Sequence, residues 1–270
     1  MSYEFDVAAL LSPPDILQCK RVLCVQPHPD DNEIGMGGVI AALSDRGCEV
    51  HYLTVTNGDK GHIDKSVSPE ETAMILLDEG RAAGRALGAK EFYFLGHGDG
   101  LLSDVLGLSK EIAGVIRHVQ PDAVFCPDPH LPYEGHWDHI VTGRATSHAF
   151  QMSGIAHFRL AGMPIPYGDE MPAQPGVSSP WQVKAIGYYF TARPNTVVDI
   201  TDTFERKMAS IALHTIQIDA QTLAMYRLYF TMKGEELAAG RGFEIGEGLK
   251  VLSKLHTHCF VDADNIGMDR

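Results

Sequence analysis

Two short segments of the sequence concentrate side chains that can bind a divalent metal ion. They are PHPDD at 27–31 and GHWDH at 135–139. Together they offer an imidazole and a carboxylate from one segment and a second imidazole from the other. Three protein ligands with a position left for water are typical of a catalytic zinc. Asp30, beside the proposed ligand Asp31, could be the base that water needs near neutral pH. The pattern therefore predicts a metal-dependent hydrolase.

Each segment also has an ordinary explanation when it is taken alone. Asp and Pro are common in turns, and Asp138 is an adequate N-cap for a helix. The two segments together are more specific, because both follow predicted strands and contain the ligand types that zinc prefers. His136 and His139 are three residues apart, so in a helical turn they share a face. One of them can then bind metal while the other points at substrate.

Apolar runs and amphipathic stretches alternate along the chain and predict the scaffold that positions these segments. Strands are expected at 21–26, 49–56, 91–95, 123–127, 183–190 and 197–200. Helices are expected at 35–46, 68–87, 104–118, 138–150 and 202–217. This alternation predicts an α/β, Rossmann-like fold with a mainly parallel sheet and helices on both faces. Ligands of such sheets bind at the carboxyl ends of the strands, so the active site should lie there.

The length of the chain suits a single domain, which we expect to span residues 1–270. We expect residues 1–20 to form a leader with a short helix and residues 240–270 to form a C-terminal tail. Residues 161–180 are rich in proline and glycine and predict a long loop. Loops of that length are often functional.

Composition narrows the partners and the compartment. The formal net charge of −13 disfavours nucleic acid and an anionic membrane surface as partners. The N-terminus lacks the basic region of a signal peptide, and no apolar stretch has the length of a membrane span. The five cysteines include no CxxC pair, which suggests free thiols in a reducing compartment. We therefore expect a cytoplasmic protein that acts on a small molecule.

The HPDD motif at 28–31, a following helix with two adjacent glycines and the later HWDH motif resemble the PIG-L/LmbE family of zinc-dependent N-deacetylases. Longer stretches at 22–40, 120–139 and 193–214 resemble the diacetylchitobiose deacetylase branch of that family. The resemblance runs over most of residues 20–260. It implies removal of an acetyl group from an N-acetylated amino sugar or glycoside, of the N-acetylglucosamine or diacetylchitobiose type.

The resemblance also implies roles for individual residues. A zinc ion would be held by His28, Asp31 and His139. Asp30 would act as the general base, and a protonated His136 would help to stabilise the tetrahedral oxyanion. The expected chemistry is therefore zinc-assisted hydrolysis of an amide.

Residues around this centre are expected to support or contact the substrate. Asp138 would orient His136 or His139 from behind the metal. Asp99 matches a family position that contacts substrate, although an Asp-Gly pair is also an ordinary turn. Trp137 could form a wall of the pocket or simply pack.

One position departs from the family pattern. Where the family commonly carries an arginine that helps to hold a substrate hydroxyl, this chain has Leu76. Glu79 occupies the associated glutamate position, and the nearest arginine in the sequence is Arg81. We therefore expect sugar recognition to differ from that of the family.

The C-terminal sequence HTHCF at 256–260 resembles a segment that, in the diacetylchitobiose branch, sends a histidine into the active site of a neighbouring subunit. The resemblance implies a homo-oligomer, such as the hexamer of that branch. His256 matches the position better than His258, because it keeps Phe260 four residues on. A solvated tail histidine is the alternative.

Other functions remain open from the residues alone. The same zinc centre could serve an amidase acting on a thiol conjugate, or a hydratase, because one fold can host different reactions. A Rossmann-like binding module without metal is the non-enzymatic alternative. Metal analysis would distinguish the binding module, and acetate release would distinguish the deacetylase.

Overall fold

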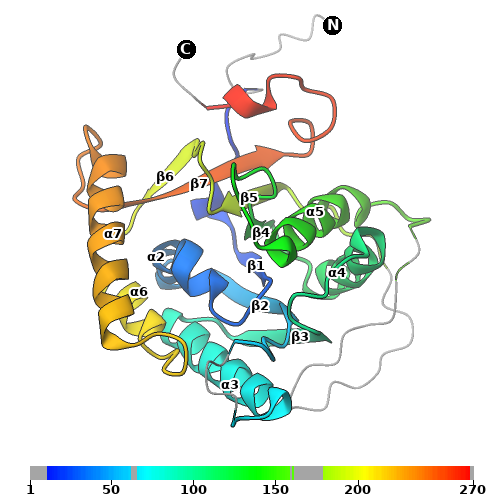
Figure 1. Cartoon of the computed structure of the whole chain (residues 1–270). Coiled ribbons are helices and arrows are strands. Elements are labelled where there is room, and N and C mark those ends of the chain that lie inside the picture. The colour runs from blue at the N-terminus through cyan, green and yellow to red at the C-terminus, as the bar shows by residue number, and fades with distance from the viewer. Residues whose placement is uncertain (1–10, 62–65, 159, 161–178, 268–270) are drawn as a thin grey trace, which may run out of the picture.

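The computed structural model describes residues 11–61, 66–158, 160 and 179–267. Within these residues the chain forms a seven-stranded sheet in the order β3-β2-β1-β4-β5-β7-β6 (Figure 1). Its strands are β1 (Arg21–Gln26), β2 (Glu49–Thr56), β3 (Glu91–His97), β4 (Ala123–Pro127), β5 (Ala185–Tyr189), β6 (Thr196–Asp199) and β7 (Gly246–Ser253). The neighbours from β3 to β5 pair in parallel, whereas β7 is antiparallel to both β5 and β6. The predicted α/β fold with a mainly parallel sheet is confirmed.

Helices cover both faces of the sheet (Figure 1). One face carries α2 (Asp31–Asp45), α3 (Pro69–Leu87) and α6 (Phe204–Ile211), which contact one another. The opposite face carries α4 (Val105–Val119) packed on α5 (Trp137–Met152). Helix α7 (Ala220–Ala238) packs against β7, and its Tyr226 and Phe230 join the apolar cluster on the α2 face. The short 3-10 helices are η1 (Ile16–Gln18) and η2 (Ala263–Asn265). Among the described helices, none is both long enough and apolar enough to cross a membrane.

Strand β1 lies in the middle of the sheet and packs on both faces. Its side chains alternate, so that Val22 and Cys24 join the apolar cluster under α2 while Leu23 and Val25 join the cluster under α4. All four side chains are fully buried. A strand covered on both sides reads as a continuous apolar run, which is why this segment could be recognised from the sequence.

Helix α3 follows the local signals in its sequence. The side chain of Ser68 accepts a hydrogen bond from the backbone N–H of Glu71, and Pro69 occupies the first helical position. The helix ends at Gly88, whose φ of 97° places it in the left-handed region that favours glycine. These predicted boundaries are confirmed within one residue.

Two predicted helices are wrong in their extent. Helix α2 begins at Asp31 rather than 35, because acidic side chains are favourable in a first helical turn. It also contains a kink at Met36, whose φ of −151° and ψ of 25° are not helical. The helix expected at 202–217 covers only Phe204–Ile211.

Two elements near the C-terminus differ from the sequence prediction. Residues 240–270 were expected to be a tail, but they include strand β7, which pairs with both β5 and β6. Two glycines and two charged residues in β7 hide its strand character, because strand propensity depends on tertiary packing. Helix α7 was likewise not predicted. Residues 1–10 of the expected leader and 161–178 of the expected loop lie outside the described residues.

Candidate metal site

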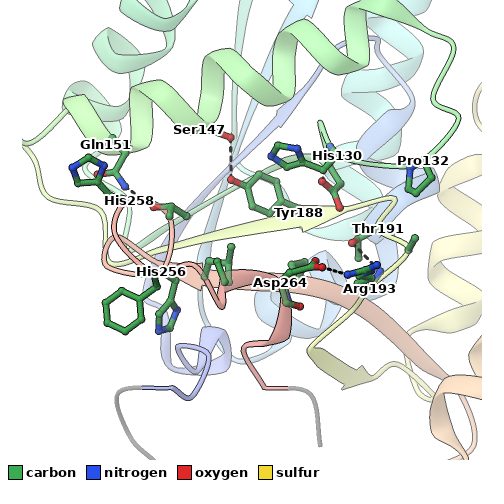
Figure 2. A pocket seen from close by; sticks show the side chains of 17 residues that line it. His130, Pro132, Ser147, Gln151, Tyr188, Thr191, Arg193, His256, His258 and Asp264 are labelled. Atoms are coloured by element: carbon green, nitrogen blue, oxygen red, sulfur yellow. Dashed lines mark hydrogen bonds and ion pairs between the residues drawn. The ribbon is translucent and has the colours of Figure 1, made fainter. Parts of the chain in front are cut away.

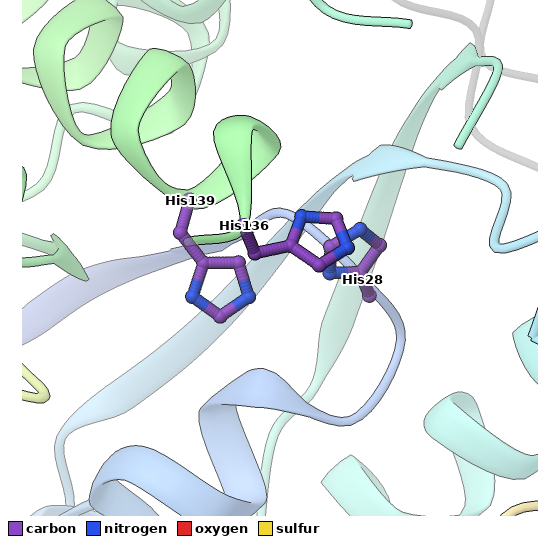
Figure 3. Close-up of side chains that lie close together, drawn as sticks. All are labelled: His28, His136 and His139. Carbon is purple, nitrogen blue, oxygen red and sulfur yellow. The ribbon is translucent and has the colours of Figure 1, made fainter. Parts of the chain in front are cut away.

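The two histidine segments, 27–31 and 135–139, meet because of the order of the strands. Strand β1 pairs in parallel with both β2 and β4. From β1 the chain adds β2 and β3 on one side and then crosses to add β4 and β5 on the other side, so the strand order reverses between β1 and β4. Such a reversal opens a crevice at the carboxyl ends of the two strands. His28 lies in the loop after β1, and His136 and His139 lie at the start of α5, which follows β4 (Figure 3).

Three histidines converge at this crevice (Figure 3). The ring centroids of His28 and His136 are 4.5 Å apart, and that of His139 lies 5.4 Å from His28 and 5.2 Å from His136. One ligand atom from each of the three lies within 4.8 Å of the others, so this group could hold a metal ion. His28, Asp99 and Asp138 form a second such group.

Asp31 belongs to neither group but connects two of the histidines. Its Oδ2 atom lies 3.2 Å from Nδ1 of His28, and its Oδ1 atom lies 3.2 Å from Nε2 of His139. These distances are close to the roughly 3.3 Å that separates two ligand atoms of a tetrahedral zinc ion. In addition, the buried Nε2 atom of His28 and Nδ1 atom of His139 have no hydrogen bond of standard geometry with a described group. The donor set therefore fits a bound cation.

Electrostatics also favours a cation at this position. Burial alone would lower the pKa of His28, but the carboxylates of Asp138, Asp31 and Asp99 raise it to about 12. Burial opposes ionisation of Asp31, yet the charges of His139 and His28 hold the pKa of its carboxyl well below the usual range. The three carboxylates around His28 favour positive charge at this point. A divalent metal ion supplies more positive charge than a proton does.

Asp30 differs sharply from its neighbour Asp31. The surrounding protein withdraws its carboxyl group from water, and this desolvation together with the negative charge of Asp31 raises the pKa of Asp30 to about 6. A carboxylate with a pKa near the working pH can both take up and release a proton. This behaviour suits a general base.

The environment of His136 opposes the protonated form expected from the sequence. Burial and the positive charges of His28 and His139 lower the pKa of His136. The residue is nevertheless exposed, so its ring can face a bound molecule. A neutral imidazole still carries one N–H donor.

Asp138 and Asp99 bring the loop after β3 into the site. The fully buried carboxylate of Asp138 accepts hydrogen bonds from the backbone N–H of Gly100 at 2.6 Å and of Leu102 at 3.3 Å. Its Oδ2 atom lies 3.5 Å from Nε2 of His28, so it contacts this imidazole, whereas a contact with a histidine of the second segment was expected. Asp99 Oδ1 lies 3.3 Å from the same nitrogen.

Two residues beside the site were not singled out from the sequence. Glu134 accepts a hydrogen bond from the backbone N–H of His136 at 2.7 Å, and its Oε2 atom lies 3.4 Å from Nδ1 of His139. Phe190 stacks on His139 with 5.9 Å between ring centroids and 11° between ring planes. Its φ of 53° is rare for an aromatic residue, and such conformations concentrate at functional sites. The position of Glu134 two residues before His136 was a signal that could have been used.

A buried acid–histidine pair lies behind Asp30. Glu33 and His214 are fully buried, with 3.7 Å between Oε2 and Nε2. Burial lowers the pKa of His214, but the carboxylates of Glu33, Asp30 and Glu79 raise it above the usual value. Glu79 also accepts a hydrogen bond from the backbone N–H of Thr215 at 2.9 Å, which fixes the turn after α6. No short sequence pattern links these groups, because three separate elements supply them.

The remaining predicted substrate residues lie in different surroundings. Trp137 is 58% exposed at the start of α5, next to the histidines. Leu76 is fully buried, so its side chain has no access to a molecule in the site. Arg81 lies over the ring of Phe94, 5.4 Å from the centroid, and 3.5 Å from Asp78.

His256 does not lie with the histidine site of its own chain. It is only 3% exposed, and its Nδ1 atom accepts a hydrogen bond from the backbone N–H of Ser253 at 3.1 Å. It also packs against Phe260, with 5.8 Å between ring centroids. It lines a separate cavity of about 640 Å³ (Figure 2), with His130, Ser147, Tyr188, Arg193, His258 and Asp264 among the other residues. The alternative of a solvated tail histidine therefore does not describe His256.

The chain has an α/β fold with a cluster of histidines and carboxylates where the strand order reverses. This combination is typical of a metal-dependent hydrolase. Residues 23–150 match the family described as PIG-L: GlcNAc-PI de-N-acetylase. The chain is 34% identical to the diacetylchitobiose deacetylase of Thermococcus kodakarensis over 243 residues, which cover 88% of this chain and 85% of that protein. The chain therefore belongs to the PIG-L family, as predicted.

Other relatives agree with this assignment. The structure of the N,N'-diacetylchitobiose deacetylase from Pyrococcus horikoshii superposes with a TM-score of 0.78 and 35% identity, covering 91% of this chain and 89% of that chain. The 1D-myo-inositol 2-acetamido-2-deoxy-alpha-D-glucopyranoside deacetylase of Kineococcus radiotolerans is 27% identical, covering 83% of this chain and 77% of that protein. Both similarities span most of each chain, so they include the C-terminal half beyond the family match.

Proposed function

We propose that this chain is a zinc-dependent hydrolase that removes the acetyl group from an N-acetylated amino sugar or glycoside, of the N-acetylglucosamine or diacetylchitobiose type. The observation that carries the proposal is the convergence of His28, Asp31 and His139 beside a second carboxylate, Asp30, whose pKa is raised to about 6. Similarity to sugar N-deacetylases over most of the chain supports the reaction and the class of substrate.

In this proposal His28, Asp31 and His139 would hold the zinc ion. When bound, zinc supplies a Lewis acid that polarises the acetyl carbonyl and makes water more acidic. The imidazole and carboxylate ligands are those that catalytic zinc prefers. Asp138, Asp99 and Glu134 would keep the imidazoles in place from behind, since such carboxylate partners fix the orientation of metal-binding histidines.

Asp30 would carry the proton through the reaction. As the water oxygen attacks the acetyl carbon, its proton passes to the Asp30 carboxylate. When the C–N bond breaks, the leaving amine nitrogen takes up that proton, and the products are acetate and a free amino sugar. A pKa of about 6 leaves Asp30 ionised before the attack at neutral pH, yet able to hold a proton briefly. The exposed His136 would donate a hydrogen bond to the oxyanion.

Substrate recognition would rest on the rim of the crevice. Asp99 could accept a hydrogen bond from a sugar hydroxyl, and the exposed indole of Trp137 offers an apolar face against which a sugar ring could pack. Leu76 leaves the family's arginine position without a donor. Hydroxyl recognition on that side would therefore be weaker than in relatives that carry the arginine.

We further propose that the chain works as a homo-oligomer in the cytoplasm, with a hexamer as the expected assembly. All five cysteines, each in the described part of the chain, are free thiols, which suits a reducing compartment. In such an assembly His256 would need to approach a neighbouring site from the position it occupies beside Ser253.

An acetate-release screen tests the proposal directly. Purified protein is loaded with zinc, its metal content is measured, and it is incubated with N-acetylglucosamine, diacetylchitobiose and their glycosides. We expect one zinc ion per chain and acetate in equal amount to free amine. Zinc without acetate release would favour the amidase on a thiol conjugate or the hydratase, and a chain that binds no metal would favour a binding module.

A further inference from the structure

Helix α2 carries Asp30 at its N-cap and Asp31 in its first turn, and it is kinked one turn later at Met36. A kink deprives nearby backbone groups of their partners in the helix. The carbonyl of Ile34 and the N–H of Val39 flank the kink, and each has a side-chain partner. The first turn of α2 precedes the kink, so the groups that fix the kink also fix the orientation of that turn.

Both partners belong to one buried ion pair. The Nζ atom of Lys207, from α6, donates a hydrogen bond to the carbonyl of Ile34 at 2.8 Å. The Oε2 atom of Glu247, from β7, accepts a hydrogen bond from the N–H of Val39 at 2.7 Å. Lys207 and Glu247 also contact each other directly, as an ion pair. The pair therefore connects the two halves of the kinked helix.

The side chains of the pair are withdrawn from water and packed against other residues. The side chains of Lys207 and Glu247 are 3% and 8% exposed. The ammonium group lies 4.1 Å from the centroid of the Phe230 ring. A methyl group added at Gly37 would lie 3.1 Å from Cγ of Lys207, so the lysine stem packs closely against the kink.

A buried ion pair adds little to the free energy of unfolding. Removing two charges from water can cost more than their attraction returns, and apolar residues of similar size are often as stable. A buried pair is better explained when it selects one geometry among several. Here the geometry selected is that of the helix turn containing Asp30 and Asp31.

We propose that Lys207 and Glu247 are positioning residues for the active site, which set the kink of α2 and thereby the placement of Asp30 and Asp31 against the histidines. The inference rests on the proposed function, because it takes Asp31 as a metal ligand. Helix α6 and strand β7 contribute no residue to the histidine cluster. In this proposal their role is to fix the position of the first turn of α2.

The experiment measures zinc affinity of the apo protein by competition with a chromophoric chelator, together with thermal unfolding. In Lys207→Met and Glu247→Gln, we expect zinc affinity to fall by about tenfold or more, as for the loss of groups that orient metal ligands. The double variant Lys207→Met/Glu247→Leu has no unpaired buried charge. We expect it to unfold at or above the temperature of the single variants and still to bind zinc about tenfold more weakly.

A neighbouring ion pair provides a matched control. Arg206 contacts Asp45 at 2.5 Å and donates to the carbonyl of Ala41 at 3.2 Å, so it also connects α6 to α2, but beyond the kink. Arg206→Met should leave zinc affinity within about twofold, because it is remote from the first turn. Gly37→Ala, which keeps both charges but crowds Lys207, should weaken zinc binding without removing the pair.

Two results would overturn the inference. The first is native zinc affinity in the double variant, which would give the pair a role in stability alone. The second is an equal effect of the Arg206 and Lys207 variants, which would make the effect a general one of loosening α6. If a single variant does not fold, the double variant and Gly37→Ala decide. Failure of the proposed reaction is distinguishable, because wild-type protein would then bind zinc but release no acetate. Wild-type protein that binds no zinc would overturn both the function and the inference.

Discussion

Two regions of the molecule contain histidines among acidic side chains, but only one is arranged for a cation. In the crevice between β1 and β4, His28 faces the carboxylates of Asp31, Asp99 and Asp138 at 3.2–3.5 Å. Every group of described residues that could hold a metal ion contains His28. In the cavity beside the C-terminal residues, Arg193 and Asp264 form an ion pair (Figure 2).

The second cavity owes its shape to hydrogen bonds within the chain. Tyr188 and Ser147 share a hydrogen bond of 2.9 Å, and Lys250 donates to the carbonyl of Asp264 at 2.8 Å. His256 is likewise bonded to the backbone of Ser253. The difference shows that the types of residue do not define a metal site. What distinguishes the metal site is that several carboxylates converge on one imidazole.

Removal of a proposed ligand should have the largest effect. In His139→Ala we expect zinc to be lost from purified protein and turnover to fall below detection, because the site would retain only two of its three ligands. Metal analysis and acetate release measure the two effects. His130→Ala, which removes a histidine of the second cavity, is the control and should keep its metal. A His139→Ala protein with a full complement of zinc would refute the ligand assignment.

Loss of the general base should leave the metal in place. In Asp30→Asn we expect stoichiometric zinc, an intact fold and a turnover reduced by about 10²-fold or more. Near-normal turnover would move the base to another residue, of which Glu33 is the nearest buried candidate.

The pH profile sharpens this prediction. Desolvation and Asp31 raise the pKa of Asp30 to about 6, so its base form is lost as the pH falls through that value. A bound cation would move the transition to lower pH. We therefore expect kcat/KM to fall on the acidic side at or below about pH 6, and this limb should be missing from the residual activity of Asp30→Asn. An unchanged acidic limb in that variant would assign the limb to another group.

Asp99 should matter less than the ligands. It lies 3.3 Å from His28, and in the proposal it also faces the sugar. Asp99→Asn keeps the shape and removes the charge, so we expect kcat/KM to fall about tenfold, as for one hydrogen bond to a charged group. A fall in zinc affinity with unchanged KM would show that the residue supports His28 rather than the substrate.

The C-terminal residues test whether the second cavity is separate from the active site of a neighbouring subunit. If His256 acts in a neighbouring site, mixed assemblies of His139→Ala and His256→Ala chains should regain activity above either parent, since some sites would be complete. Truncation before Lys254 should weaken assembly and activity together. His258→Ala, which alters an exposed neighbouring histidine, should change neither. A monomeric protein, or no recovery despite proven exchange of subunits, would leave His256 with only its packing role beside Phe260.

The sequence by itself determined the parts of the molecule that depend on local signals. Strand β1 is a short apolar run, and helix α3 has a capping Ser68 and a terminal Gly88, so their bounds could be predicted. The two histidine segments were recognised because each is compact in sequence and follows a strand. Their meeting followed from the general rule that sites form at the carboxyl ends of parallel strands.

Tertiary structure alone decided the features that join distant segments. The kink of α2 lies beside Lys207 and Glu247, which come from α6 and β7 and have no local signature in the sequence. Phe190, after β5, stacks on His139, and His214 reaches Glu33 only because α6 packs against α2. The pKa values of Asp30 and Asp31 also shift in opposite directions, although the two residues are adjacent and chemically identical in the sequence. Burial raises both pKa values, but the contacts of Asp31 with His139 and His28 outweigh burial and lower its pKa. The reason is physical, since desolvation and charge pairing depend on distances in space that sequence separation does not specify.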